Sequence, residues 1–88
     1  LAQEEGSEQQ ARAESAESLS LLLTEIVLLD EEIHAEYAFL VTKVVEGFDY
    51  YDRGLFSAAE VAVTDATNSM ARLDQLFAER EELVNQFG

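Results

Sequence analysis

From Leu19 onward, the large apolar residues recur at intervals of three and four, which is the spacing of one face of an α-helix. A glycine, Gly54, separates two such series. The first series consists of Leu19, Leu22, Ile26, Leu29, Ile33, Tyr37, Leu40, Val44, Phe48 and Tyr51. The second consists of Phe56, Ala59, Val63, Ala66, Met70, Leu73, Phe77, Arg80, Val84 and Phe87. This pattern predicts two long helices joined by one turn.

The composition agrees with an all-α fold, because the chain has no Pro and only 4 Gly to interrupt helices. Its 88 residues are enough for one domain. We expect a first helix over about 19–53, a turn over 54–57 and a second helix over about 58–87. The residues before them, 1–18, are acidic and rich in Gln and Ser. This lead-in is expected to be a frayed helix or disordered.

The predicted turn carries three local signals. Gly54 fits the position after a helix that adopts a left-handed backbone. Ser57 and Glu60 have the spacing of a capping box, with Ser57 as the N-cap of the second helix. Phe56 and Val61 flank this box as a hydrophobic staple would. The short turn makes the two helices antiparallel neighbours, a helical hairpin.

Folding back at Gly54 places residues equally distant from it in sequence at the same level of the hairpin. Lys43 then lies level with Asp65, and Glu36 lies level with Arg72, so two complementary charge pairs are expected to set the register. Arg80 is a charged residue within the apolar series. It is expected either to pair with an acid (Glu25, Glu31 or Glu32) or to lay its stem along the apolar contact.

The first helix is apolar on more than one side. Beside the main series run Leu23, Val27, Ala38, Val41 and Val45, followed by a group of Leu21, Leu28 and Phe39. One neighbouring helix cannot cover so wide a surface. We therefore expect hairpins to assemble into a four-helix bundle or a larger helical oligomer, most simply from copies of one chain, with a helical protein partner as the alternative. The predicted interface residues are Leu22, Leu23, Ile26, Val27, Leu29, Val41 and Val45.

Glu31 and His34 form a Glu-x-x-His pair, whose side chains lie one helical turn apart and can reach one metal ion. In this pair the chain resembles the small encapsulated ferritins, which build a di-iron bundle from two-helix chains. The resemblance implies a site for iron or another divalent metal at a subunit interface, with Asp74 or Glu25 as a further ligand. Without a metal, His34 is a polar-edge residue bonded to Asp74 or Asp30, or a pH-sensitive interface residue.

The formal net charge of −14 argues against nucleic acid and anionic lipid as partners, because proteins bind phosphate mainly through Lys and Arg. The apolar run from Leu19 to Leu29 is about half as long as a membrane-spanning helix, and no basic segment precedes it as in a signal peptide. The sequence is therefore compatible with a cytoplasmic protein or one exported after removal of an upstream signal.

The sequence contains no catalytic triad, Cys nucleophile or Gly-rich phosphate loop. The expected function is a non-enzymatic structural, scaffold or adaptor role, without a cofactor, carried out through helix–helix association. The alternatives are the ferritin-like metal bundle and an acidic regulator of a basic protein.

Overall fold

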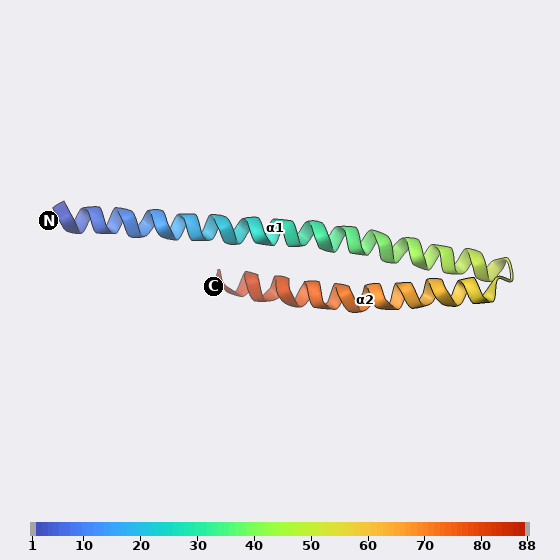
Figure 1. Ribbon diagram of the computed structural model, residues 1–88. Helices are drawn as coiled ribbons and strands as arrows, with labels where there is room; N and C mark the ends of the chain where they lie inside the picture. Colours follow the sequence, from blue (N-terminus) through green and yellow to red (C-terminus); the bar gives the residue numbers. More distant parts are fainter. Residues whose placement is uncertain (1, 88) are drawn as a thin grey trace.

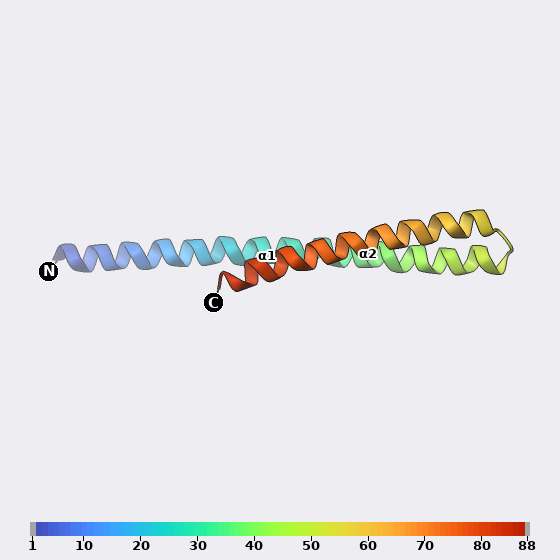
Figure 2. The same cartoon turned by 90° about the horizontal axis from the view of Figure 1, so that it is seen from below.

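The protein is an antiparallel hairpin of two long helices (Figure 1). The computed structural model describes the backbone of residues 2–87 and the side chains of residues 15–87. Helix α1 spans Ala2–Asp52 and helix α2 spans Phe56–Asn85. The molecule measures 79 × 15 × 13 Å. In the view from below, α2 crosses α1 at a shallow angle, so the helices coil around each other (Figure 2). The predicted all-α hairpin is confirmed.

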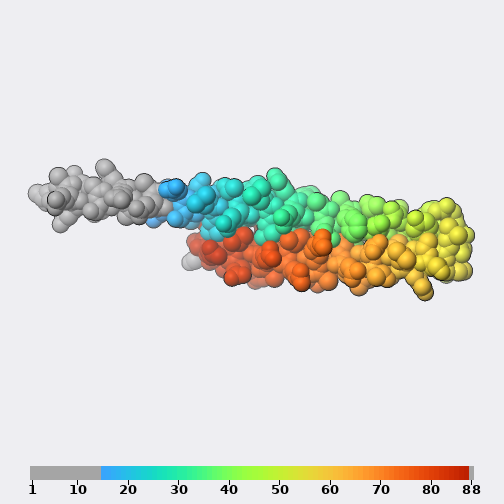
Figure 3. All heavy atoms as spheres, viewed as in Figure 1, coloured from blue at the N-terminus to red at the C-terminus, as the bar shows by residue number. Residues whose placement is uncertain are grey.

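The contact between the helices is a continuous seam, in which side chains fill the space between α1 and α2 (Figure 3). Seam residues are the buried or half-buried residues that alternate at intervals of three and four on both helices. On α1 they are Leu22, Ile26, Leu29, Ile33, Glu36, Leu40, Lys43, Gly47 and Tyr50. On α2 they are Ala59, Ala62, Ala66, Ser69, Leu73, Leu76, Arg80 and Leu83.

Side-chain size changes along the seam. Near the turn it contains Gly47, Ala59 and Ala62, and a Cβ added to Gly47 would lie 3.6 Å from the Ala62 Cβ. Small residues let two helix backbones approach closely, so this end has little apolar volume of its own. Toward the open end, Ile26, Leu29 and Leu73 supply larger side chains. The apolar core of the hairpin therefore lies mainly away from the turn.

Only part of the expected apolar series faces the partner helix. Leu22, Ile26, Leu29, Ile33 and Leu40 lie in the seam. From residue 36 to the turn, the α1 seam positions are instead largely polar or small, and Tyr37, Val44, Phe48 and Tyr51 are exposed. In α2 the exposed members of the expected series are Phe56, Val63, Met70, Phe77, Val84 and Phe87.

The turn has the hydrogen bonds of a Schellman motif. The Leu55 N–H donates to the Tyr50 carbonyl at 2.8 Å, and the Gly54 N–H donates to the Tyr51 carbonyl at 3.0 Å. Gly54 has φ = +76°, which confirms its predicted left-handed backbone. The predicted capping box is wrong. Leu55 precedes α2 without a side-chain cap, because the helix already begins at Phe56 and Ser57 lies inside it.

Phe56 does not staple onto Val61 as expected. Its ring packs edge-on against Tyr51, with ring centroids 5.5 Å apart, and both Phe56 and Val61 remain exposed. The aromatic contact thus joins the last turn of α1 to the first turn of α2.

At its N-terminal end α1 extends well past the end of α2 (Figure 1). The helix begins at Ala2 rather than near residue 19. Fraying or disorder of the lead-in stays a prediction, and the side chains of residues 1–14 lie outside the described residues.

Candidate interaction surface

One long side of the hairpin is lined by large exposed apolar side chains, and we call it the apolar face. Near the turn, Val44, Phe48 and Tyr51 of α1 and Val63 and Met70 of α2 line a common groove of about 430 Å³. Its floor is formed by the small seam residues, and its lining is almost entirely apolar. Because small residues form the floor, the larger side chains on both sides stand above it as walls.

The apolar face continues along the hairpin. Its exposed α2 members recur every seven residues, a spacing that returns to nearly the same side of a helix. On α1 the same spacing relates Tyr37 to Val44, and Val41 to Phe48. The face therefore consists of Tyr37, Val41, Val44, Phe48 and Tyr51 on α1 and of Phe56, Val63, Met70, Phe77 and Val84 on α2.

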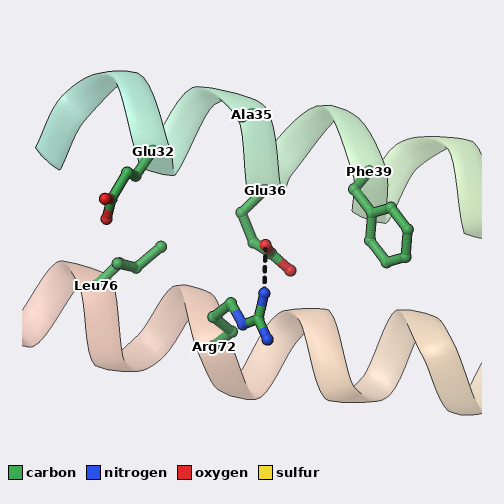
Figure 4. A pocket seen from close by; sticks show the side chains of 6 residues that line it. All are labelled: Glu32, Ala35, Glu36, Phe39, Arg72 and Leu76. Carbon is green, nitrogen blue, oxygen red and sulfur yellow. Dashed lines mark hydrogen bonds and ion pairs between the residues drawn. The ribbon is translucent and has the colours of Figure 1, made fainter. Parts of the chain in front are cut away.

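The opposite long side carries ionic groups, and we call it the charged face. Its residues are Glu32, Glu36, Lys43, Glu46, Asp65 and Arg72, together with Phe39. Figure 4 shows Arg72 of α2 reaching across to Glu36 of α1, where Nη1 lies 3.5 Å from Oε2. Lys43 Nζ lies 3.8 Å from Asp65 Oδ2. Both cross-helix pairs are those that the register places level, and their role in setting that register stays a prediction.

Lys43 is held by a second acid on its own helix. Its Nζ donates a 3.1 Å hydrogen bond to Glu46 Oε2 and lies 5.4 Å from the centre of the Phe39 ring. The hydrogen bond to Glu46 and the charges of Glu46 and Asp65 raise the pKa of Lys43 above its ordinary value. The lysine therefore stays positively charged between these carboxylates.

Ser69 connects the seam to the charged face. It is 2% exposed, and its hydroxyl donates to Glu36 Oε1 at 2.7 Å and lies 3.2 Å from the Glu36 carbonyl oxygen. The Glu36 carboxylate thus receives hydrogen bonds from both Ser69 and Arg72. A buried hydroxyl or carboxylate without a hydrogen-bond partner is costly. The contact gives each of the two groups a partner, which explains how Glu36 is tolerated at a seam position.

Arg80 and Asp30 form an ion pair at the open end of the hairpin. The Arg80 Nε donates a 2.6 Å hydrogen bond to Asp30 Oδ1, and both side chains are partly exposed. Asp30 is therefore the partner of Arg80 in place of the expected Glu25, Glu31 or Glu32. Asp30 lies seven residues before Tyr37, so the pair interrupts the apolar face at this level.

The structure divides the expected interface residues into two sets. Ile26 and Leu29 are each 7% exposed because α2 covers them, and Leu22 is half-buried in the same seam. These three side chains are used within the hairpin. The remaining four are exposed, namely Leu23, Val27, Val41 and Val45.

Sequence reasoning missed that Val44, Phe48 and Tyr51 form one surface with Val63 and Met70. A signal was available in the exact sevenfold spacing of Phe56, Val63, Met70, Phe77 and Val84. This spacing runs beside the α2 seam rather than along it.

Glu31, His34 and Asp74, the residues expected to bind a metal, are all exposed. In the part of the chain that the structure describes, no group of three or more His, Asp or Glu side chains is placed to hold a metal ion. A site shared between two chains stays a prediction.

Within the described residues, neither helix has a stretch both long and apolar enough to cross a membrane. Comparisons with models of protein families, with curated proteins and with solved structures find no match to this chain.

Proposed function

We propose that this protein is a non-enzymatic helical module that works by binding a second copy of itself through the apolar face. Two hairpins stacked in this way form a four-helix bundle with the two apolar faces inside and the charged faces outside. Such a bundle would serve as a structural, scaffold or adaptor element.

The observation that carries this proposal is the row of large exposed apolar side chains on both helices, which the Asp30–Arg80 pair interrupts near the open end. Contiguous apolar patches of this kind mark interaction sites on proteins. Helix α2 has 30 residues and the hairpin is 15 Å wide. At 1.5 Å per residue, the covered side has a projected area of about 700 Å². This is close to the ~800 Å² per partner that a stable interface uses.

The charge distribution supports the same orientation of the faces. On the charged face, Lys43 and Arg72 are paired with acids of their own chain, so this side is suited to solvent. A chain with a net charge of −14 also needs an apolar contact to bring two copies together. The apolar face offers that contact and exposes few charges at its centre.

Two valines provide a matched test. Val61 and Val63 lie two residues apart on α2 and are 62% and 59% exposed, but Val61 lines the charged face and Val63 the apolar face. In an isolated hairpin, replacing either by Asp has the same small effect. In the proposed dimer, Val63→Asp buries an unpaired charge and weakens association by about 2 kcal/mol or more, whereas Val61→Asp leaves the dimer intact.

The measurement is molar mass by light scattering at two protein concentrations, with helicity followed by circular dichroism. We expect the wild type and Val61→Asp to have twice the mass of the chain, and Val63→Asp to dissociate on dilution. A folded wild-type monomer at both concentrations would contradict the proposal.

A further inference from the structure

Two hairpins can stack face to face in two symmetric ways. In a same-end dimer both turns lie at one end of the bundle, and α1 of each copy lies against α2 of the other. In an opposite-end dimer the turns lie at the two ends, so that α1 lies against α1 and α2 against α2. All neighbouring helices are antiparallel in both arrangements, so helix packing alone does not choose between them. The side chains at the margins of the apolar face can.

The margins are the rows just outside the central apolar row on each helix. Phe48 on α1 and Glu60 and Thr67 on α2 line the grooves on this side of the hairpin, which locates both rows. With the sevenfold helical spacing, the α1 margin is Val27, His34, Val41 and Phe48. The α2 margin is Glu60, Thr67, Asp74 and Glu81.

A same-end dimer brings the α1 margin of one copy against the α2 margin of the other at equal distance from the turn. His34 and Asp74 are each twenty residues from Gly54, so they meet across the interface. By the same rule Val41 meets Thr67. Glu60 and Glu81 then lie against apolar residues of the second copy and can extend their carboxylates into water. No acid of one margin faces an acid of the other.

An opposite-end dimer places two acidic margins together. The apolar row of α2 runs from Phe56 to Val84 and is centred on Met70. The α2 rows of the two copies overlap fully when the symmetry axis of the dimer passes near Met70. Glu60 of one copy then lies beside Glu81 of the other, and this happens twice in the dimer. Like charges in direct opposition destabilise an interface, and here they add to the repulsion between two chains of net charge −14.

The Asp30–Arg80 pair favours the same-end dimer for a second reason. In that arrangement the two Asp30–Arg80 pairs lie at the same level, and Asp30 of one chain lies near Arg80 of the other, so each charge gains a second partner on being covered. In the opposite-end dimer the pair lies over the apolar groove around Gly47 and Val44. Removing an ion pair from water without further polar partners is unfavourable.

We therefore propose that the second copy docks on the apolar face with its turn at the same end, pairing His34 of each chain with Asp74 of the other. This orientation rests on the self-association proposed above. The His34–Asp74 contacts would lie on both sides of the bundle and act as the specificity element of the interface.

Spin-label distances separate the two orientations, because the chain has no Cys of its own and single labels can be placed at will. Ser57→Cys and Asn85→Cys put labels on exposed sites near the two ends of α2. In the same-end dimer each variant gives a label–label distance of roughly 15–25 Å, set by helix packing. In the opposite-end dimer both give about 40 Å or more, since about 27 residues at 1.5 Å each separate the labels along the bundle.

Ala71→Cys is the control, because its exposed site lies next to the middle of the apolar row and gives a short distance in either dimer. Short distances at all three sites support the proposal. A short distance at residue 71 alone overturns the same-end orientation but leaves the dimer standing. Loss of every distance, together with a monomeric mass, overturns the dimer itself.

The His34–Asp74 contact is tested by exchanging its charges. Both residues are exposed in the hairpin, so their variants keep the fold. We expect His34→Asp to weaken dimerisation about tenfold or more, by placing two acids together, and the double variant His34→Asp/Asp74→His to recover most of the loss. A double variant no tighter than His34→Asp overturns this contact.

Discussion

The apolar face and the charged face border the same seam. They differ in whether the side chains on them find their contacts within a single chain. On the charged face, Lys43 lies between Glu46 and Asp65, and Arg72 reaches Glu36. Each of these cations has its partner within the hairpin. On the apolar face, Val44 and Val63 line an open groove and remain exposed on both helices.

This difference shows that a two-helix fold can satisfy its polar groups and still leave much of its apolar surface in water. A pair of helices has one seam, and here small and polar residues take up half of that seam. Several of the larger apolar residues lie on one side of the seam instead, on the apolar face. Lys43 and Arg72 therefore have their acidic partners within the hairpin, whereas its large apolar side chains are incompletely buried, which is the basis for proposing a second copy.

The largest expected effect comes from placing a charge in the seam between the helices, because both faces depend on that packing. Ile26 is 7% exposed, whereas Leu28, two residues away, is 55% exposed. Ile26→Asp buries an unpaired charge and should cost about 3 kcal/mol or more. We expect loss of most helicity by circular dichroism, and Leu28→Asp to retain it. Comparable melting of the two variants would contradict the assigned seam.

A smaller effect should separate the two partners of one ion pair on the charged face. The Glu36 side chain is 14% exposed and accepts from the buried Ser69, while the Arg72 side chain is 69% exposed. Glu36→Ala should destabilise the protein by about 1–3 kcal/mol, because Ser69 loses its best acceptor. Arg72→Ala should cost less than about 1 kcal/mol, as exposed ion pairs do. Urea unfolding measures both, and equal losses would mean that Ser69 contributes little.

Gly47 and Gly54 should respond to alanine with opposite signs. A Cβ at Gly47 meets only ordinary contacts, the nearest at 3.6 Å, so Gly47→Ala should stabilise α1 by about 0.5–1 kcal/mol. Gly54 has φ = +76°, so Gly54→Ala should destabilise the turn by about 1 kcal/mol. Thermal melting at fixed protein concentration checks both signs. If Gly47→Ala instead weakens the dimer, the groove floor is closer to the second copy than we infer.

The smallest expected effect concerns Lys43 and pH. Its pKa is raised by Glu46 and Asp65, so its contribution is present below the ordinary lysine pKa of 10.5 and is lost as pH rises through the higher, folded-state value. The stability difference between wild type and Lys43→Gln should therefore shrink as the pH is raised above 10.5. A difference that stays constant over this range would show that the contacts of Lys43 do not depend on its charge.

Much of the fold could be predicted from local signals. Gly54 lies between two helical patterns, and the count of residues from it placed Lys43 level with Asp65 and Glu36 level with Arg72. The start of α2 could not be predicted in the same way. The Ser57–Glu60 spacing matched a capping box, but the Schellman hydrogen bonds of Leu55 and Gly54 let the helix begin before Ser57.

The candidate surface was only partly predictable. Ile26 and Leu29 were expected to bind another chain and are instead covered by α2. Val41 and Val45 are exposed as an interface would need, but Val44 and Phe48 were assigned to the main series of the first helix. Neighbouring rows on an apolar helix differ by one position, so spacing alone does not say which row a partner helix covers.

Two helices, one turn and the register between the helices follow from the sequence, because local periodicity, a glycine and a short connection specify them. Which side of each helix faces the other became known from the folded hairpin. That choice depends on both partners together. Ala59, Ala62, Ala66 and Ser69 allow close approach, and Ser69 and the cross-helix cation Arg72 accommodate Glu36 at the seam. As a result Val44, Phe48, Val63 and Met70 are left to form the apolar face.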